Sequence, residues 1–176
     1  MKTIAVLFIF VICCFTHSTG GDDMLAKGTA APLFELKDSN GKLFRLVDYR
    51  DNKSVVLVFY PGDATPVCTK QLCEIRDDYS SFERQGAVAF GINPASAESH
   101  GKFSAKHDFG FPLLIDERGA VAAAYGAKGP VSNKRTVYVI DKAGRIAFAR
   151  RGTPSVADIL AATGESAEKG ASDTVR

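Results

Sequence analysis

The chain has 176 residues, which is enough for one domain whose core needs no disulfide support. Its 22 basic and 20 acidic residues leave a formal net charge of +2 and are interspersed, without a polybasic block. This balance argues against nucleic acid and against an anionic membrane surface as partners.

The N-terminus has the pattern of a secretory signal peptide. A short basic start, Met1-Lys2-Thr3, precedes an apolar run at residues 4–15, and small polar residues follow as far as Gly21. About a dozen apolar residues are fewer than the roughly 20 that a membrane-spanning helix needs, which argues against the alternative of an uncleaved anchor. We therefore expect residues 1–20 to be removed and the mature protein to be exported, periplasmic or secreted, with no membrane attachment.

The four cysteines fall into two pairs. Cys13 and Cys14 lie inside the apolar run and would be lost with it, which leaves Cys68 and Cys73 in the mature chain. In an oxidising compartment such a pair readily becomes a disulfide. At this point both a structural disulfide and a redox-active pair are open.

Strand and helix patterns alternate after the signal. Asn40-Gly41 between apolar residues predicts a β-hairpin. Residues 54–60 form an unbroken β-branched and aromatic run, which is typical of a strand buried on both faces. From Cys68 to Phe82 the apolar residues recur in steps of four and three, which predicts one helix.

The same alternation continues to the C-terminus. Strands are expected at residues 87–92, 111–115, 136–140 and 145–149, and helices at 97–107, 120–125 and 153–164. Gly164 is expected to end the last helix and to leave residues 165–176 as a flexible tail. The prediction is one α/β domain at residues 21–164, with a central mixed β-sheet flanked by helices and an N-terminal β-hairpin.

Cys68 is expected in the first turn of its helix. Thr65 has the chemistry of an N-cap and Pro66 suits the first helical position, so Cys68 would be the third residue. Unpaired backbone N–H groups and the helix dipole stabilise a thiolate there, which is the nucleophilic form of cysteine. The same N–H groups can bind an oxyanion or a peroxide oxygen, so the loop before Cys68 is a candidate redox site.

The spacing Pro61-x-x-x-Thr65-x-x-Cys68 resembles the active-site signature of the peroxiredoxins. With Cys73 five residues further on, the chain is similar to the peroxiredoxin Q or bacterioferritin-comigratory-protein subgroup, an atypical two-cysteine type. Residues 31–41, 99–116 and 135–141 resemble further segments of that family. The resemblance implies a thioredoxin-like fold.

The resemblance also implies a role for each matching residue. Cys68 would be the peroxidatic thiolate and Cys73 the resolving thiol in the same helix. Thr65 and Arg135 would orient the peroxide and stabilise the thiolate, and Pro61 would shield the site. The sequence departs from the family pattern at Gly62, Val67 and Asn93-Pro94.

The function that the resemblance implies is a thiol-dependent peroxidase. It would reduce hydrogen peroxide or alkyl hydroperoxides, form an intramolecular disulfide, and be recycled by a thioredoxin-like reductant. We expect no cofactor, no metal and a monomeric state.

Two other functions fit the expected fold. An exported thiol–disulfide oxidoreductase would normally carry Cys-x-x-Cys. A copper-binding assembly factor usually spaces its cysteines by three residues and holds the metal with a distant histidine in a late loop, where this sequence has no convincing candidate. His100 and His107 are expected on a partly solvated helix face rather than as ligands.

Overall fold

The computed structural model describes residues 24–172, with side chains as far as Gly164. The expected signal peptide at residues 1–20 lies outside the described residues, as do the last four residues of the expected tail. None of the helices in the described part is long and apolar enough to cross a bilayer.

The centre of the fold is a seven-stranded mixed sheet formed by this part of the chain. Its strands are β1 (Glu35–Asp38), β2 (Leu43–Arg45), β3 (Ser54–Phe59), β4 (Ala87–Asn93), β5 (Leu113–Ile115), β6 (Thr136–Ile140) and β7 (Ile146–Arg151). They are ordered β2-β1-β5-β4-β3-β6-β7. The β3–β4 and β4–β5 pairs are parallel and the other pairs are antiparallel, so the predicted mixed sheet and N-terminal hairpin are confirmed.

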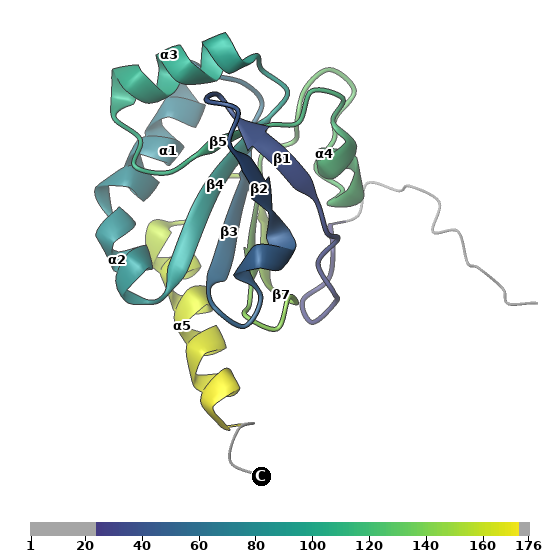
Figure 1. Ribbon diagram of the computed structural model, residues 1–176, viewed down its shortest axis with the longest axis vertical. Coiled ribbons are helices and arrows are strands. Elements are labelled where there is room, and N and C mark those ends of the chain that lie inside the picture. The colour runs from purple at the N-terminus through teal and green to yellow at the C-terminus, as the bar shows by residue number, and fades with distance from the viewer. Residues whose placement is uncertain (1–23, 173–176) are drawn as a thin grey trace, which may run out of the picture.

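Helices cover the two faces of the sheet (Figure 1). They are the 3-10 helix η1 (Leu46–Tyr49) and the α-helices α1 (Pro66–Asp77), α2 (Tyr79–Arg84), α3 (Ala97–His107), α4 (Ala120–Ala124) and α5 (Val156–Ser172). Buried residues of α1, α2, α3 and α5 share one hydrophobic cluster, while those of η1 and α4 belong to the cluster on the opposite face. The protein is therefore a three-layer α/β sandwich.

The buried positions follow directly from the sequence pattern. Along β3, Val56 and Val58 join one cluster while Leu57 and Phe59 join the other, as the period of two requires of a strand covered on both faces. The predicted helix from Cys68 to Phe82 is present but is interrupted at Asp78, whose φ of −100° and ψ of 10° separate α1 from α2.

The predicted end of the last helix is wrong. The helix α5 starts at Val156, slightly later than expected, and continues beyond Gly164 to Ser172. Gly164 does not have a positive φ, so it does not form a left-handed cap. A glycine inside a helix costs only about 1 kcal/mol relative to alanine, and the flanking alanine, glutamate and lysine residues favour continuation. Flexibility of residues 165–176 stays a prediction.

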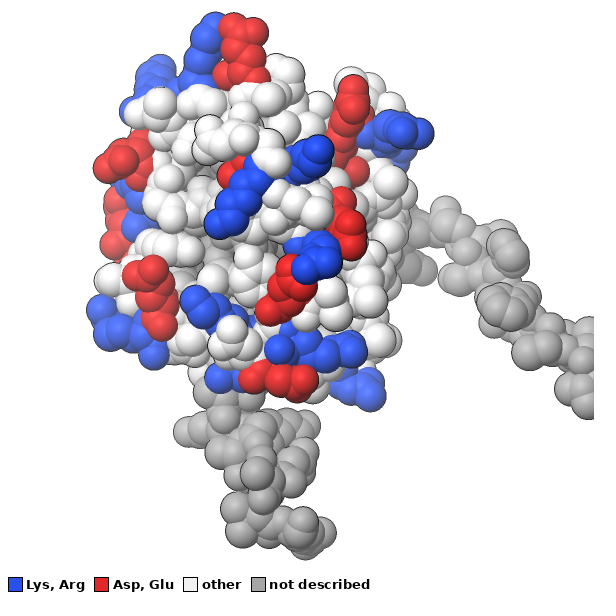
Figure 2. Space-filling view, in the orientation of Figure 1, with Lys and Arg blue, Asp and Glu red and all other residues white. Residues whose placement is uncertain are grey.

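Charge is mixed on the face of the molecule that Figure 2 shows. Basic and acidic side chains are interspersed over it, without a large patch of one sign. This agrees with the near-neutral balance of the sequence.

The sheet brings three chain segments to one edge. In the register, Phe59 at the end of β3 lies beside Ile92 near the end of the parallel strand β4, and beside Thr136 at the start of the antiparallel strand β6. The loop before α1, the turn after β4 and the residue before β6 therefore meet there. Ligand sites of open α/β sheets gather at such carboxyl ends.

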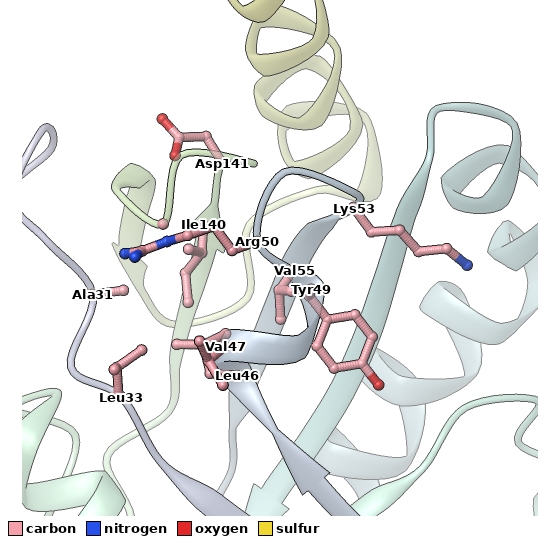
Figure 3. Close-up of a pocket in the computed structure, with 11 residues that line it drawn as sticks. Ala31, Leu33, Leu46, Val47, Tyr49, Arg50, Lys53, Val55, Ile140 and Asp141 are labelled. Carbon is pink, nitrogen blue, oxygen red and sulfur yellow. The ribbon is translucent and has the colours of Figure 1, made fainter.

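The opposite end of the sheet holds a small pocket between η1, Val55 of β3 and Ile140 of β6 (Figure 3). Its volume of about 10 Å³ is that of a single water-sized probe, which is too little for a substrate. The functional site must be sought at the edge that carries Cys68.

Truncation of Leu72 tests how α1 is held on the sheet. Leu72 is fully buried one turn after Cys68, so Leu72→Ala should lower the free energy of unfolding by roughly 2–5 kcal/mol through lost burial and a new cavity. Urea unfolding measures it. Lys70→Ala, at a side chain that is 78% exposed in the same helix, is the control and should change stability by less than about 0.5 kcal/mol. Equal effects would contradict the packing of α1 described above.

Candidate active site

Cys68 lies where the helix-start signals place it. Thr65 is the N-cap of α1 with extended backbone angles (φ −78°, ψ 141°), and Pro66 is the first helical residue. Cys68 is therefore the third residue, and it is fully buried. The Thr65 side chain makes no capping hydrogen bond, so its hydroxyl is not used by the helix and can bind another group.

Arg135 contacts the sulfur of Cys68. It immediately precedes β6, and its Nη2 donates to Cys68 Sγ at 3.1 Å. Its Nη1 donates to Gln71 Oε1 at 2.8 Å, which fixes the plane of the guanidinium. The Cys68 sulfur therefore contacts a guanidinium directly.

Gln71 is a site residue that the sequence reasoning missed. It follows Cys68 by three residues, so both side chains lie on the same face of α1, and it is only 3% exposed. Its spacing from Cys68 was the only local signal. Because glutamine is common in helices, that spacing did not indicate that Arg135 would bind it. Gln71 also lines a groove of about 820 Å³ between α1 and residues 153–156.

Beside Cys68, the loop between β3 and α1 is held by the carboxylate of Asp63. Four groups donate to it, from the residue after β3, from β4 and from α3: Tyr60 Oη at 2.9 Å, Asn93 Nδ2 at 2.9 Å, Ser99 Oγ at 2.6 Å and His100 Nδ1 at 3.0 Å. The Asp63 side chain is 5% exposed and that of His100 is fully buried. We call these five residues the Asp63 network.

The Asp63 network corrects the expected position of His100. His100 does not face solvent. The helix α3 begins after its N-cap Ser96, and this start places Ser99 and His100 on the helix face that contacts the loop. Within that loop Ala64 adopts a φ of +58°, a left-handed conformation that costs roughly 1–2 kcal/mol in a residue with a side chain. Such strain persists only where the surroundings hold the backbone, and the hydrogen bonds to Asp63 do so.

Protonation follows from this arrangement. Burial alone would raise the pKa of Asp63, but the hydrogen bonds of His100, Ser99 and Asn93 and the His100 charge lower it to about 2. Burial, followed by the adjacent Asp63 charge, raises the pKa of Tyr60 well above its usual value. Asp63 is therefore an acceptor and Tyr60 a donor throughout the ordinary pH range.

Cys73 lies in the same helix as Cys68 but away from it. Both cysteines are unbridged. Cys73 is half-buried at the edge of the hydrophobic cluster, and its Sγ lies 3.9 Å from Nδ1 of His107 at the end of α3. His107 is half-buried, which agrees with the predicted partly solvated face, and it also contacts a cysteine.

The remaining predicted residue, Pro61, is half-buried at the start of the loop. The structure thus brings Pro61, Thr65, Cys68 and Arg135 to one edge of the sheet and leaves Cys73 further along α1. A buried cysteine at a helix N-terminus, in contact with an arginine directly before a neighbouring strand, indicates a thiol-based redox protein of thioredoxin-like fold.

Comparison with known proteins gives the family. The chain belongs to the AhpC/TSA family, whose model matches residues 27–149. Peroxiredoxin Bcp of Bacillus subtilis (strain 168) is 40% identical over 127 residues, which cover 68% of this chain and 80% of the relative. Chloroplastic peroxiredoxin Q of Arabidopsis thaliana is 45% identical over 121 residues, which cover 67% of this chain and 56% of the relative. The chain thus spans little more than half of that longer relative.

Solved structures agree with this assignment. Peroxidoxin BcpB from Mycobacterium tuberculosis has a TM-score of 0.73 and 34% identity, with 80% of this chain and 96% of that chain covered. A peroxiredoxin Q structure from Xanthomonas campestris has a TM-score of 0.67 and 26% identity, with 77% and 90% covered. The predicted family resemblance and the thioredoxin-like fold are confirmed.

Replacement of Asp63 tests the network through its pH dependence. Asp63→Asn should lower the free energy of unfolding at neutral pH by about 2 kcal/mol, because the pKa of Asp63 falls from its ordinary 3.8 to about 2 on folding. This contribution is complete above the unfolded value and is lost as the pH falls from 3.8 to about 2. The difference in free energy of unfolding between wild type and Asp63→Asn, measured by urea unfolding, should therefore become smaller as the pH falls over that range.

Asp48→Asn is the matched control. Asp48 pairs with Arg45 at 3.0 Å, but both side chains are about half exposed, so its loss should cost less than about 1 kcal/mol. A pH-independent effect of Asp63→Asn would show that its carboxylate is not the stabilising form.

Proposed function

We propose that this protein is a thiol-dependent peroxidase that reduces hydrogen peroxide and organic hydroperoxides at Cys68. The observation that carries the proposal is the position of the Cys68 sulfur, buried in the first turn of α1 and 3.1 Å from Arg135 Nη2. Membership in the AhpC/TSA family and relatives named peroxiredoxin Bcp and peroxiredoxin Q support it.

The first step is attack of the Cys68 thiolate on the peroxide. A bond forms between Sγ and one peroxide oxygen, the O–O bond breaks, and the other oxygen leaves as water or alcohol after it takes up a proton. Arg135 stabilises the thiolate and the negative charge that develops on the departing oxygen. The unused Thr65 hydroxyl and the backbone N–H groups at the start of α1 orient the peroxide, and Pro61 shields the loop from water.

In the second step Cys73 condenses with the sulfenic acid of Cys68 to form a disulfide, with loss of water. Five residues in an intact helix rise about 7.5 Å, and their side chains diverge. A disulfide needs Cα atoms within roughly 7 Å of each other with converging side chains. The N-terminal turns of α1 must therefore unwind before the disulfide closes.

A thioredoxin-like protein is the proposed reductant of that disulfide. Because the resolving cysteine lies in the same chain, turnover needs no second subunit, which supports a monomer. The signal-like N-terminus supports an exported location, periplasmic or secreted. These three points rest on the sequence pattern and on the family.

The two alternative functions have weaker support. The four residues between Cys68 and Cys73 differ from the Cys-x-x-Cys of thiol–disulfide oxidoreductases. For the copper-binding factor, the described side chains contain no group of three or more His, Cys, Asp or Glu residues placed to hold a metal ion. The peroxidase is the function that uses both cysteines and Arg135.

Consumption of peroxide by the pre-reduced protein tests the proposal. Wild type should consume hydrogen peroxide stoichiometrically and Cys68→Ser should consume none. Arg135→Met should slow the reaction roughly 10²-fold, as removal of one stabilising donor does in other enzymes. The control is Arg150→Met, since Arg150 pairs with Asp158 on the surface at 2.9 Å and should not affect the rate. Consumption by Cys68→Ser at the wild-type rate would overturn the proposal.

Amide hydrogen exchange tests the unwinding of α1. Protection across residues 68–75 should be high in the reduced protein and should fall when the disulfide forms, because the backbone hydrogen bonds of these turns are lost. Cys73→Ser treated with the same peroxide is the control and should keep its protection. Equal protection in both redox states, with the disulfide confirmed by mass, would mean that Cys73 is not the partner of Cys68.

A further inference from the structure

A second polar cluster surrounds Cys73 at the contact of α1 with the end of α3. The Cys73 Sγ lies 3.9 Å from His107 Nδ1, within the range for a hydrogen bond to sulfur. On the next turn of α1, Arg76 Nη1 donates to the backbone carbonyl oxygen of His107 at 2.5 Å. The residue that carries the imidazole is thus fixed to the same helix that carries the thiol.

Aromatic rings hold the His107 imidazole in place. It is stacked on Phe109 with ring centroids 5.7 Å apart and an interplanar angle of 22°. The Phe103 ring meets it edge-on at 5.1 Å and 73°. With the ring held in this position, Nδ1 lies toward the Cys73 sulfur. Ring packing alone would not require that orientation.

Charged groups of both signs surround the pair formed by Cys73 and His107. Arg76 is ion-paired with Asp77 at 2.7 Å. Arg76 donates from Nε and Nη2 to Asp77 Oδ1, and this hydrogen bond is the main cause that raises the pKa of Arg76, while burial lowers it. Asp77 and Asp108 oppose a negative sulfur, while Arg76 and a protonated His107 support it.

We propose that His107 is the general base of the resolving step, accepting the Cys73 thiol proton at Nδ1. The inference rests on the proposed peroxidase function. A free thiol is only a few per cent thiolate at neutral pH, and a neighbouring base makes the nucleophile available. A base within hydrogen-bond reach of the proton that it removes has the required geometry, and catalytic contacts are often long before the substrate is bound.

The step balances without any further reactant. Proton transfer from Sγ to Nδ1 occurs while α1 is folded and gives the thiolate of Cys73 and an imidazolium. When α1 unwinds, the thiolate attacks the sulfenic sulfur of Cys68, so the S–S bond forms and the S–O bond breaks. The departing hydroxide becomes water with one proton, and His107 returns to its neutral form by releasing the proton that it took.

Alkylation of Cys73 tests the base without any peroxide. In a Cys68→Ser background the rate of reaction with iodoacetamide is measured against pH. His107→Phe, which keeps an aromatic ring but has no basic nitrogen, should slow alkylation at neutral pH roughly tenfold, while the rates should converge at high pH where the thiol ionises unaided. Lys106→Gln at the exposed neighbouring position is the control and should not change the profile.

Arg76→Gln separates the base from the surrounding charge. If Arg76→Gln slows alkylation and His107→Phe does not, the charge of Arg76 alone accounts for the reactivity and the proposal is overturned. An unchanged rate in both variants overturns it equally. Because these measurements use no peroxide, they stand even if the protein proves not to be a peroxidase.

The complete reaction provides the second measurement. The otherwise wild-type protein is mixed with one equivalent of hydrogen peroxide, quenched at intervals and analysed by mass for sulfenic acid and disulfide. His107→Phe should leave peroxide consumption unchanged and slow disulfide formation roughly tenfold at neutral pH, with recovery at high pH. Equal rates of disulfide formation at neutral pH would overturn the proposal, whereas absence of peroxide consumption by wild type would refute the proposed function instead.

Discussion

The contact between Arg135 and the Cys68 sulfur is the interaction around which this structure is organised. It exists because β6 runs antiparallel to β3, so that the residue before β6 and the loop after β3 meet at one edge of the sheet. Neither group alone would distinguish the site, since a helix N-terminus favours any anion and an arginine at a strand end is ordinarily solvated. Together they place a buried sulfur between the N-terminus of α1 and a guanidinium, which is the arrangement on which the proposed attack on a peroxide depends.

The Asp63 network holds the loop that leads from β3 into α1, directly before Cys68. Four donors converge on one buried carboxylate and hold a loop that includes Ala64 in a left-handed conformation. Because the pKa of Asp63 lies at about 2, the carboxylate stays charged under all ordinary conditions. The network therefore fixes the path of the chain into Pro66 and so the direction in which the N–H groups of the first helical turn point.

The sequence predicted the features that depend on neighbouring residues, and it did not predict those that depend on which elements pack together. Thr65, Pro66 and Cys68 lie within four consecutive residues, so their spacing alone placed the sulfur in the first turn. The unbroken apolar run of β3 identified a strand covered on both faces. The partners Gln71, Asp63, His100 and His107 lie on helix faces or in a loop, and their importance depends on which element packs opposite. Periodicity predicted a partly solvated face for both histidines, because it reports only the pattern of the helix itself. It contains no information about the carboxylate that tertiary packing places beside His100 or the thiol that it places beside His107. The end of α5 failed for a different reason, since a single glycine is a weak stop among strong helix formers.

The distribution of contacts also explains how a buried site can open. All members of the Asp63 network belong to the end of β3, the following loop, the end of β4 and α3, and none belongs to α1. Unwinding the first turns of α1 would release Cys68 from Arg135 and separate Gln71 from the guanidinium, at the cost of burial at Leu72, but it would leave the network and α3 intact. His107 belongs to α3, which would not move. As the proposed base it can take a proton from Cys73 before α1 unwinds, and it is in the same place when α1 refolds. In the proposed mechanism the Asp63 network would therefore stay rigid, while α1, which carries both cysteines, would move.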